Sequence, residues 1–156
     1  MAIQPRAPIL TDVLDAHNSF RAQHGAAPLM WNDTLANAAE TFANKCVFQT
    51  SGGPYGENVA AGAGGGYNAM RAVQSWMAGA CFFRVKAKYD PKNPTGNQEA
   101  LAFTQMVWKN TTMVGCAAAQ CGDKLFGSNF PSSMLVVCEY YAPGNVNGQF
   151  SQNVQP

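Results

Sequence analysis

The stretch EALAFTQMVWKNTTMVGCAAAQC, residues 99–121, changes character halfway along. Its first half is compatible with a helix, and from Thr112 onward it is rich in residues that favour strands. A second β-rich stretch, SSMLVVCEYYAP at residues 132–143, follows after several turn residues. Together they predict a helix followed by two antiparallel strands near the end of the chain.

Upstream segments have the apolar spacing of amphipathic helices. They span residues 10–25, 31–46 and 68–80. Thr11 or Asp12 is a candidate N-cap for the first helix, and Asn32 or Asp33 for the second. The glycine block before the third helix breaks the chain. These segments therefore predict three helices that each bury one face.

Residues 84–98 contain two prolines and mixed charges, which predicts a long surface loop. No internal repeat is found. Helices and strands follow one another without regular βαβ alternation, so the predicted fold class is an α+β layered domain. With 156 residues, the chain has the length of one compact domain.

Composition narrows the function classes. Lys and Arg total 10 and Asp and Glu total 9, which leaves a net charge of +1 and no basic stripe for nucleic acid. No apolar run reaches the roughly 18 residues of a membrane span. The N-terminus lacks the pattern of a secretory signal, so a secreted protein would be the mature form behind an added or retained Met.

The chain has five cysteines and two histidines. No C-x-x-C motif is present and both histidines lie in one N-terminal segment, so disulfides are favoured over a zinc site. The odd count leaves one thiol, either buried and inert or exposed and able to pair with another chain. The sequons at Asn32 and Asn110 would be glycan acceptors in a secreted chain, and with the cysteines they favour export.

Five ordered blocks resemble the CAP superfamily of cysteine-rich secretory proteins, antigen 5 and pathogenesis-related class 1 proteins. The blocks are HNSFRAQHGAAPLMWNDTLANAAETFANKC (17–46), SGGPYGENVA (51–60), AVQSW (72–76), FTQMVWKNTTMVGCA (103–117) and VCEYYAPGN (137–145). The secreted plant-type class 1 pattern, which fungi also have, is the most similar. The resemblance implies a three-layer α-β-α sandwich, an extracellular location and a single domain over residues 1–156, with its core at about 9–146 and flexible tails.

The resemblance also implies a central cavity where two histidines and two glutamates hold a divalent metal. At the matching positions this chain has Thr50, Glu57, Gly79 and Ala102. One carboxylate among Thr, Gly and Ala cannot offset the loss of a metal's bound waters. The sequence therefore predicts no metal, no cofactor and no catalysis, with Glu57 accepting hydrogen bonds instead.

The two histidines, His17 and His24, lie seven residues apart on the first predicted helix, too far apart to chelate a metal without further ligands. We expect His17 to be packed and His24 to be exposed. Neither restores the metal site.

For the cysteines, the resemblance implies the disulfides Cys46–Cys121 and Cys116–Cys138. The family's third bridge has no counterpart here, so Cys81 is expected to be a free thiol. Each such bridge typically stabilises a small secreted domain by about 2 to 5 kcal/mol, so the loss of one bridge is tolerable and the loss of all would not be.

Some members of the superfamily bind sterols under an aromatic loop, and others bind fatty acids between two helices. The corresponding loop here carries Phe82, Phe83, Arg84 and Tyr89. These aromatic rings either cover an apolar ligand or pack into the core, and both alternatives stay open. The expected protein is thus a monomeric noncatalytic binder of a sterol or fatty acid, of a host or cell-wall partner, or of both. A hydrolase is the least favoured alternative.

Overall fold

The computed structural model describes residues 9–85 and 98–155. Its helices are η1 (Ile9–Val13, a π-helix), α2 (Leu14–Gln23), α3 (Asp33–Ala43), α4 (Ala69–Val85), α5 (Gln98–Met106) and α6 (Phe150–Asn153). Its strands are β1 (Met30–Trp31), β2 (Gly56–Ala63), β3 (Met113–Gly122) and β4 (Ser133–Tyr141). The strands form one sheet in the order β1-β3-β4-β2, with β1 parallel to β3 and the other pairs antiparallel.

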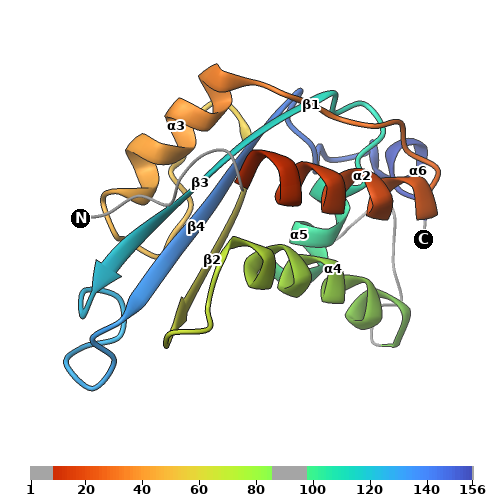
Figure 1. The fold of residues 1–156 in the computed structure, drawn as a ribbon. Coiled ribbons are helices and arrows are strands. Elements are labelled where there is room, and N and C mark those ends of the chain that lie inside the picture. Colours follow the sequence, from red (N-terminus) through yellow and green to blue (C-terminus); the bar gives the residue numbers. More distant parts are fainter. Residues whose placement is uncertain (1–8, 86–97, 156) are drawn as a thin grey trace.

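Three layers follow from this arrangement. Helix α3 packs against β3 and β4 on one face of the sheet, while α2, α4 and α5 lie on the other side (Figure 1). This confirms the predicted α+β class and the α-β-α sandwich. The two predicted terminal strands, β3 and β4, form the antiparallel pair at the centre of the sheet.

The central strands bury both faces because their side chains alternate. In β3, Cys116 and Ala118 belong to the core beside α2, α4 and α5, whereas Ala117 and Ala119 belong to the core beneath α3. Strand β4 alternates in the same way. The sandwich therefore contains two separate hydrophobic cores, one on each face of the sheet.

Each core contains one disulfide. Cys46–Cys121 lies in the core beneath α3, and Cys116–Cys138 lies in the other core. These are the two pairings that the resemblance implies. The side chain of Cys81 lies outside the described residues, so its free thiol stays a prediction.

The helix boundaries agree in part with the sequence. Asn32 caps α3 as predicted, because its Oδ1 accepts the Leu35 N–H at 3.0 Å. The caps predicted for the first helix are wrong, since Thr11 and Asp12 lie inside η1, and the helical segment begins before them. Gly25 ends that segment with φ 67°, as predicted.

The tail predicted to be flexible beyond residue 146 packs into the structure. Phe150 is 1% exposed and stacks edge-on against Trp108, with ring centroids 5.0 Å apart. Val154 is also buried in the larger core. The core therefore continues past its expected end. Within the described part of the chain, no helix is long and apolar enough to cross a membrane.

Candidate functional site

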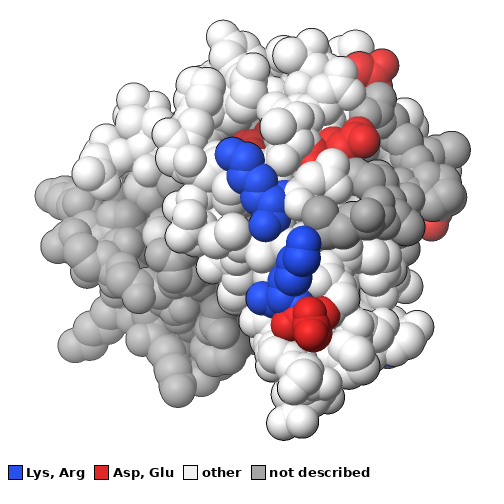
Figure 2. Space-filling model, turned by 90° about the vertical axis from the view of Figure 1, so that its left-hand side faces the viewer, with Lys and Arg blue, Asp and Glu red and all other residues white. Residues whose placement is uncertain are grey.

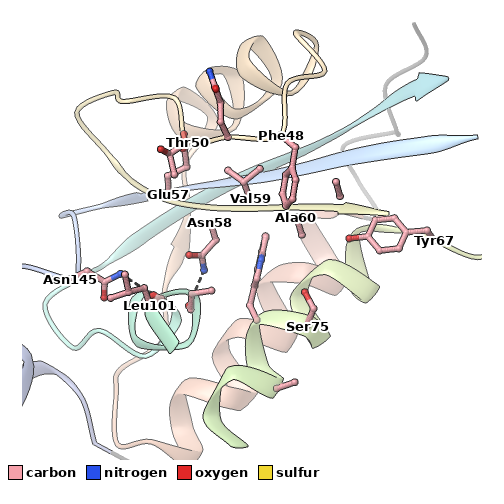
Figure 3. A pocket seen from close by; sticks show the side chains of 15 residues that line it. Phe48, Thr50, Glu57, Asn58, Val59, Ala60, Tyr67, Ser75, Leu101 and Asn145 are labelled. Carbon is pink, nitrogen blue, oxygen red and sulfur yellow. Dashed lines mark hydrogen bonds between the residues drawn. The ribbon is translucent and has the colours of Figure 1, made fainter. Parts of the chain in front are cut away.

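An open groove of about 1010 Å³ runs along β2, the outermost strand of the sheet (Figure 3). Its walls come from the segment after α3, from α4 and from α5. The groove is lined by Phe48, Gln49, Thr50, Glu57, Asn58, Val59, Ala60, Ala61, Tyr67, Ser75, Trp76, Ala78, Leu101, Ala102 and Asn145. Most of these side chains are apolar or uncharged.

The structure brings together the positions that the sequence singled out. Thr50, Glu57 and Ala102 all line the groove, although they lie far apart in the chain. Gly79 lies in α4, one residue after the lining residue Ala78. Three of the four positions therefore line the same groove, whereas Gly79 is next in sequence to a lining residue and does not line it itself.

Glu57 is held by its neighbour Ser51. The two carboxylate oxygens accept the Ser51 backbone N–H at 2.7 Å and the Ser51 hydroxyl at 2.6 Å. The prediction that Glu57 accepts hydrogen bonds from the backbone and an uncharged side chain is confirmed. These bonds also attach the segment after α3 to β2, which fixes one wall of the groove.

A second carboxyl group, Glu139, lies directly across from Glu57 in the β2–β4 register. Glu139 is only 4% exposed and does not line the groove. Burial, together with the hydrogen bond and the negative charge of Glu57, raises the pKa of Glu139 to about 9, and burial is the largest of these causes. Glu139 is therefore a protonated carboxyl group that donates a hydrogen bond to Glu57.

The sequence alone does not reveal this pair, because Glu139 is not at a position that matches one of the family's metal ligands. The strand register that places Glu139 opposite Glu57 would have been the signal, but β2 itself was not predicted. The pair is a structural contact, because Glu139 is shut away from the groove.

Beneath the groove, a chain of hydrogen bonds runs into the core. Asn58 donates to the Ala102 carbonyl at 3.0 Å and to the Tyr140 hydroxyl at 3.3 Å. The Tyr140 hydroxyl lies 2.7 Å from Nε2 of His17, whose Nδ1 lies 2.8 Å from the Val13 carbonyl oxygen. The carbonyl can only accept, so Nδ1 carries the proton and Nε2 accepts from Tyr140.

This environment keeps His17 neutral. Burial lowers its pKa to about 4, against the opposing effect of the bond to Val13. The prediction that His17 is packed is therefore confirmed. His24 is also buried, at 4% exposure, so its predicted exposure is wrong. Its Nδ1 lies 2.9 Å from the Gln155 carbonyl, and its ring packs against Phe20.

The end of the groove near Asn145 is built by α5 and the loop after β4. Asn145 donates to the Leu101 carbonyl at 2.9 Å and accepts the Thr104 hydroxyl at 2.6 Å. Gln105 accepts the Gly144 N–H at 2.8 Å. These bonds are all internal, so this end of the groove is preformed.

The donor set does not fit zinc. Within the described residues, no group of three or more His, Cys, Asp or Glu side chains gathers to hold a metal ion. Of the fifteen lining residues in the described part of the chain, only Glu57 is charged, and it is already hydrogen-bonded to Ser51. Zinc sites need three or four nitrogen, sulfur or oxygen ligands from side chains. The described side chains therefore do not form a zinc site.

The structure does not describe the side chains of the loop that was expected to cover an apolar ligand. The side chains of Phe82, Phe83, Arg84 and Tyr89 lie outside the described residues. The groove contains a different set of aromatic side chains, Phe48, Tyr67 and Trp76. Burial raises the pKa of Tyr67, so its hydroxyl stays neutral at physiological pH.

The described surface is sparsely charged. On the face that Figure 2 shows, a few basic side chains lie among acidic and many uncharged ones. This part of the described surface presents no broad basic area of the kind that binds nucleic acid.

The fold and the groove define a class of protein: a three-layer α-β-α sandwich that is cross-linked by two disulfides and open along one sheet edge. The chain belongs to the cysteine-rich secretory protein family, CAP, whose family model matches residues 14–140.

Its relatives include pathogenesis-related proteins of fungi and plants. The chain is 38% identical to Protein PRY2 of Saccharomyces cerevisiae over 151 residues, which covers 94% of this chain and 41% of that protein. It is 37% identical to Pathogenesis-related protein 1A of Nicotiana tabacum, covering 88% of this chain and 77% of that protein. The chain thus spans less than half of the yeast relative.

Solved structures share the fold. The crystal structure of NaASP2 with Zn2+ matches with a TM-score of 0.71 and 22% identity, covering 91% of this chain and 83% of that chain. At this identity the likeness shows the fold alone.

Proposed function

We propose that this chain is a secreted, noncatalytic binding protein of the pathogenesis-related class 1 type, and that the groove along β2 is its binding site. One observation carries the proposal: among the described residues, fifteen line a preformed groove, and the single carboxylate in that set is already hydrogen-bonded. Such a surface can hold a ligand, and its described residues offer neither a positioned acid–base pair nor a set of metal ligands for hydrolysis.

Two classes of ligand fit the proposal. The first is a small apolar molecule, a sterol or a fatty acid, which the aromatic side chains Phe48, Tyr67 and Trp76 would contact. The second is a host or cell-wall partner that docks without any lipid. The extracellular location is part of the proposal, supported by the family and by two disulfides, which persist in oxidising compartments.

The lipid reading is tested by titrating cholesterol and palmitate into the protein and two variants. Phe48→Ser removes a groove ring that is 59% exposed, so folding should survive. Phe126→Ser is the matched control, because Phe126 is also exposed but does not line the groove. We expect saturable binding that Phe48→Ser weakens and Phe126→Ser preserves. If the parent binds neither lipid, the partner reading alone remains.

The noncatalytic reading is tested with zinc. A ligand at a hundredfold excess over its Kd adds about 2.7 kcal/mol to the stability of the native state, a shift of several degrees in Tm. NaASP2 was crystallised with Zn2+. For this chain we expect no zinc-dependent shift, and a gain after Thr50→His, Gly79→Glu and Ala102→His are combined. A shift in the parent that Glu57→Gln abolishes would overturn the proposal.

A further inference from the structure

The free edge of β2 has a definite hydrogen-bonding pattern. Gly64, just after β2, donates its N–H to the Ser132 carbonyl at 2.8 Å, and this pair continues the β2–β4 register. Bonded and non-bonded pairs alternate in an antiparallel ladder. The even-numbered residues of β2 therefore bond to β4, and Glu57, Val59 and Ala61 direct their N–H and C=O groups away from the sheet.

The pairing of β4 with β3 leads to the same assignment of the β2 residues that bond to β4. Cys116 and Cys138 face each other across β3 and β4 with their Cα atoms 4.1 Å apart. This is the short spacing of a non-hydrogen-bonded pair, so Cys138 must direct its backbone groups toward β2. Its partner there is Asn58, an even-numbered residue. Two independent observations thus show that the backbone groups of Glu57, Val59 and Ala61 point away from the sheet.

These outward groups open into the groove. Every residue from Glu57 to Ala61 lines it, although successive side chains point to opposite faces of the sheet. Figure 3 shows Glu57 and Val59 on one side of β2 and Asn58 on the other. The groove therefore follows the strand edge itself. Within residues 9–85 and 98–155, the outward N–H groups of Val59 and Ala61 have no hydrogen-bond partner.

This edge disfavours an occupant that is purely apolar. A sterol lying along β2 would displace water from the outward groups and replace none of their hydrogen bonds. Each donor or acceptor buried in this way would lose its hydrogen bond to water without gaining another, which disfavours binding. A ligand with alternating donors and acceptors along its length would satisfy them, and an extended peptide has that pattern.

Charge restricts the peptide further. Thr50, Glu57 and Asn145 give one end of the described groove its polar character, whereas Phe48 and Tyr67 lie toward the other end (Figure 3). Among the described residues that line the groove, Glu57 is the one with a charged side chain. A cation beside it would be favoured over a carboxylate.

We propose that the occupant of the groove is an extended peptide segment that adds to the free edge of β2 as a further strand and places a basic side chain or an N-terminal amine beside Glu57. The proposal rests on the proposed function in taking the groove as the binding site, and it names the partner. Backbone hydrogen bonds from the peptide would supply affinity, and the groove walls would select its alternate side chains.

The experiment begins with selection of phage-displayed random heptapeptides on the folded protein. The enriched sequence is synthesised in three forms: unmodified, N-methylated at its odd positions and N-methylated at its even positions. Strand addition uses only one of the two sets of N–H groups. We expect one methylated form to bind at least tenfold more weakly than the unmodified peptide, and the other to bind within about threefold of it.

The protein side is tested by Val59→Pro, which removes an outward N–H and leaves the bonds to β4 in place. Val59→Thr is the matched control, since it keeps the N–H and the branched shape. We expect at least tenfold weaker peptide binding for the proline variant alone. If Val59→Pro fails to fold, the pair Ala61→Pro and Ala61→Ser repeats the test one outward position along.

Glu57→Gln tests the charge. It should weaken binding of the enriched peptide several-fold, and it should have no effect on a copy whose basic group is replaced by a neutral one.

Three results would overturn the proposal: no enriched peptide, equal loss from both methylation patterns, or binding that the proline variants leave unchanged. If lipids bind while peptides fail, this inference falls and the proposed function stands. If neither binds, this inference falls together with the lipid ligand, and the proposed function is left with a docking partner that is not an extended peptide.

Discussion

The buried residue Glu139 determines how the Glu57 carboxylate is placed at the groove. Its carboxyl group is 4% exposed and holds its proton because burial and the charge of Glu57 both disfavour a second anion. Glu57 stays the acceptor for Ser51 and for Glu139 together, so its carboxylate is rigidly placed at the groove. The exposed carboxylate is thus oriented by a buried acid.

This pair predicts the effect of Glu139→Gln. A pKa raised from 4.5 to about 9 means that the native state keeps a proton which the unfolded chain releases above pH 4.5. The contribution of Glu139 to wild-type stability therefore falls as pH rises through that range. Glutamine can still donate to Glu57 but never ionises. We expect the variant to be about 3 kcal/mol more stable at pH 7 and no more stable at pH 4, by urea unfolding.

The pH 4 measurement is the internal control for this prediction. If the variant is stabilised equally at both pH values, the gain comes from better packing. It would then not come from the removal of an ionisable group, and the prediction would be wrong. A variant that is less stable at pH 7 would contradict the protonated state of Glu139.

For single residues, the sequence predicts those properties that depend on nearby residues in the chain. Glu57 as an acceptor follows from the need of a carboxylate for partners, and His17 as a packed residue follows from its place on a helix stripe. Glu139 and His24 were missed or wrong because strand β4 and the C-terminal tail supply their partners. Such contacts depend on tertiary position and leave no local pattern.

At the scale of elements, β2 is the strand that local sequence conceals. Its eight residues, GENVAAGA, include one β-branched side chain and two glycines, a composition with low strand propensity. It is a strand because it pairs with β4 over its whole length. The helices and the terminal strands were predictable because their apolar spacing reports their own buried faces. The groove depends on β2 and was therefore seen only through resemblance.

Gly115 determines how closely α3 approaches the sheet. A Cβ atom added there would overlap the Ala36 backbone N and come 2.6 Å from the Asn32 carbonyl oxygen, so backbone would have to move. We expect Gly115→Ala to cost about 1 to 3 kcal/mol, as overpacking typically does. The measurement is the midpoint of guanidinium unfolding with both disulfides intact.

Gly65→Ala is the matched control for this change. A Cβ atom there meets nothing within 4 Å, and the residue has no positive φ that glycine alone would tolerate. We expect a change within about 0.5 kcal/mol. Equal effects from the two substitutions would show that α3 and β3 can separate without cost.

For the whole molecule, the two disulfides lie in different cores and play different parts. Cys46–Cys121 ties the segment after α3 to β3, whereas Cys116–Cys138 ties the neighbouring strands β3 and β4 to each other. Cys46–Cys121 closes 75 residues and Cys116–Cys138 closes 22. Resemblance implied the sandwich and both pairings, whereas spacing alone left the pairing open.

The dependence of global stability on pH combines two buried groups of opposite sign. His17 has a pKa lowered from 6.5 to about 4, so the unfolded chain binds a proton below pH 6.5 that the native state refuses. This makes stability fall as pH drops from 6.5 toward 4. Glu139 has a raised pKa, so its contribution falls as pH rises from 4.5 toward 9. Each changes the free energy of unfolding by about 1.4 kcal/mol per pH unit.

Between pH 4.5 and 6.5 the two slopes oppose each other, so we expect these groups to leave a stability plateau there. Above pH 6.5, of these two groups only Glu139 still acts, and stability should decline by about 1.4 kcal/mol per pH unit up to pH 8.5. Urea unfolding at half-unit steps measures this profile. In Glu139→Gln the decline should vanish, and stability should instead rise from pH 4.5 to 6.5 as His17 alone titrates. A decline above pH 6.5 that survives Glu139→Gln would assign it to another group and contradict the buried, protonated carboxyl.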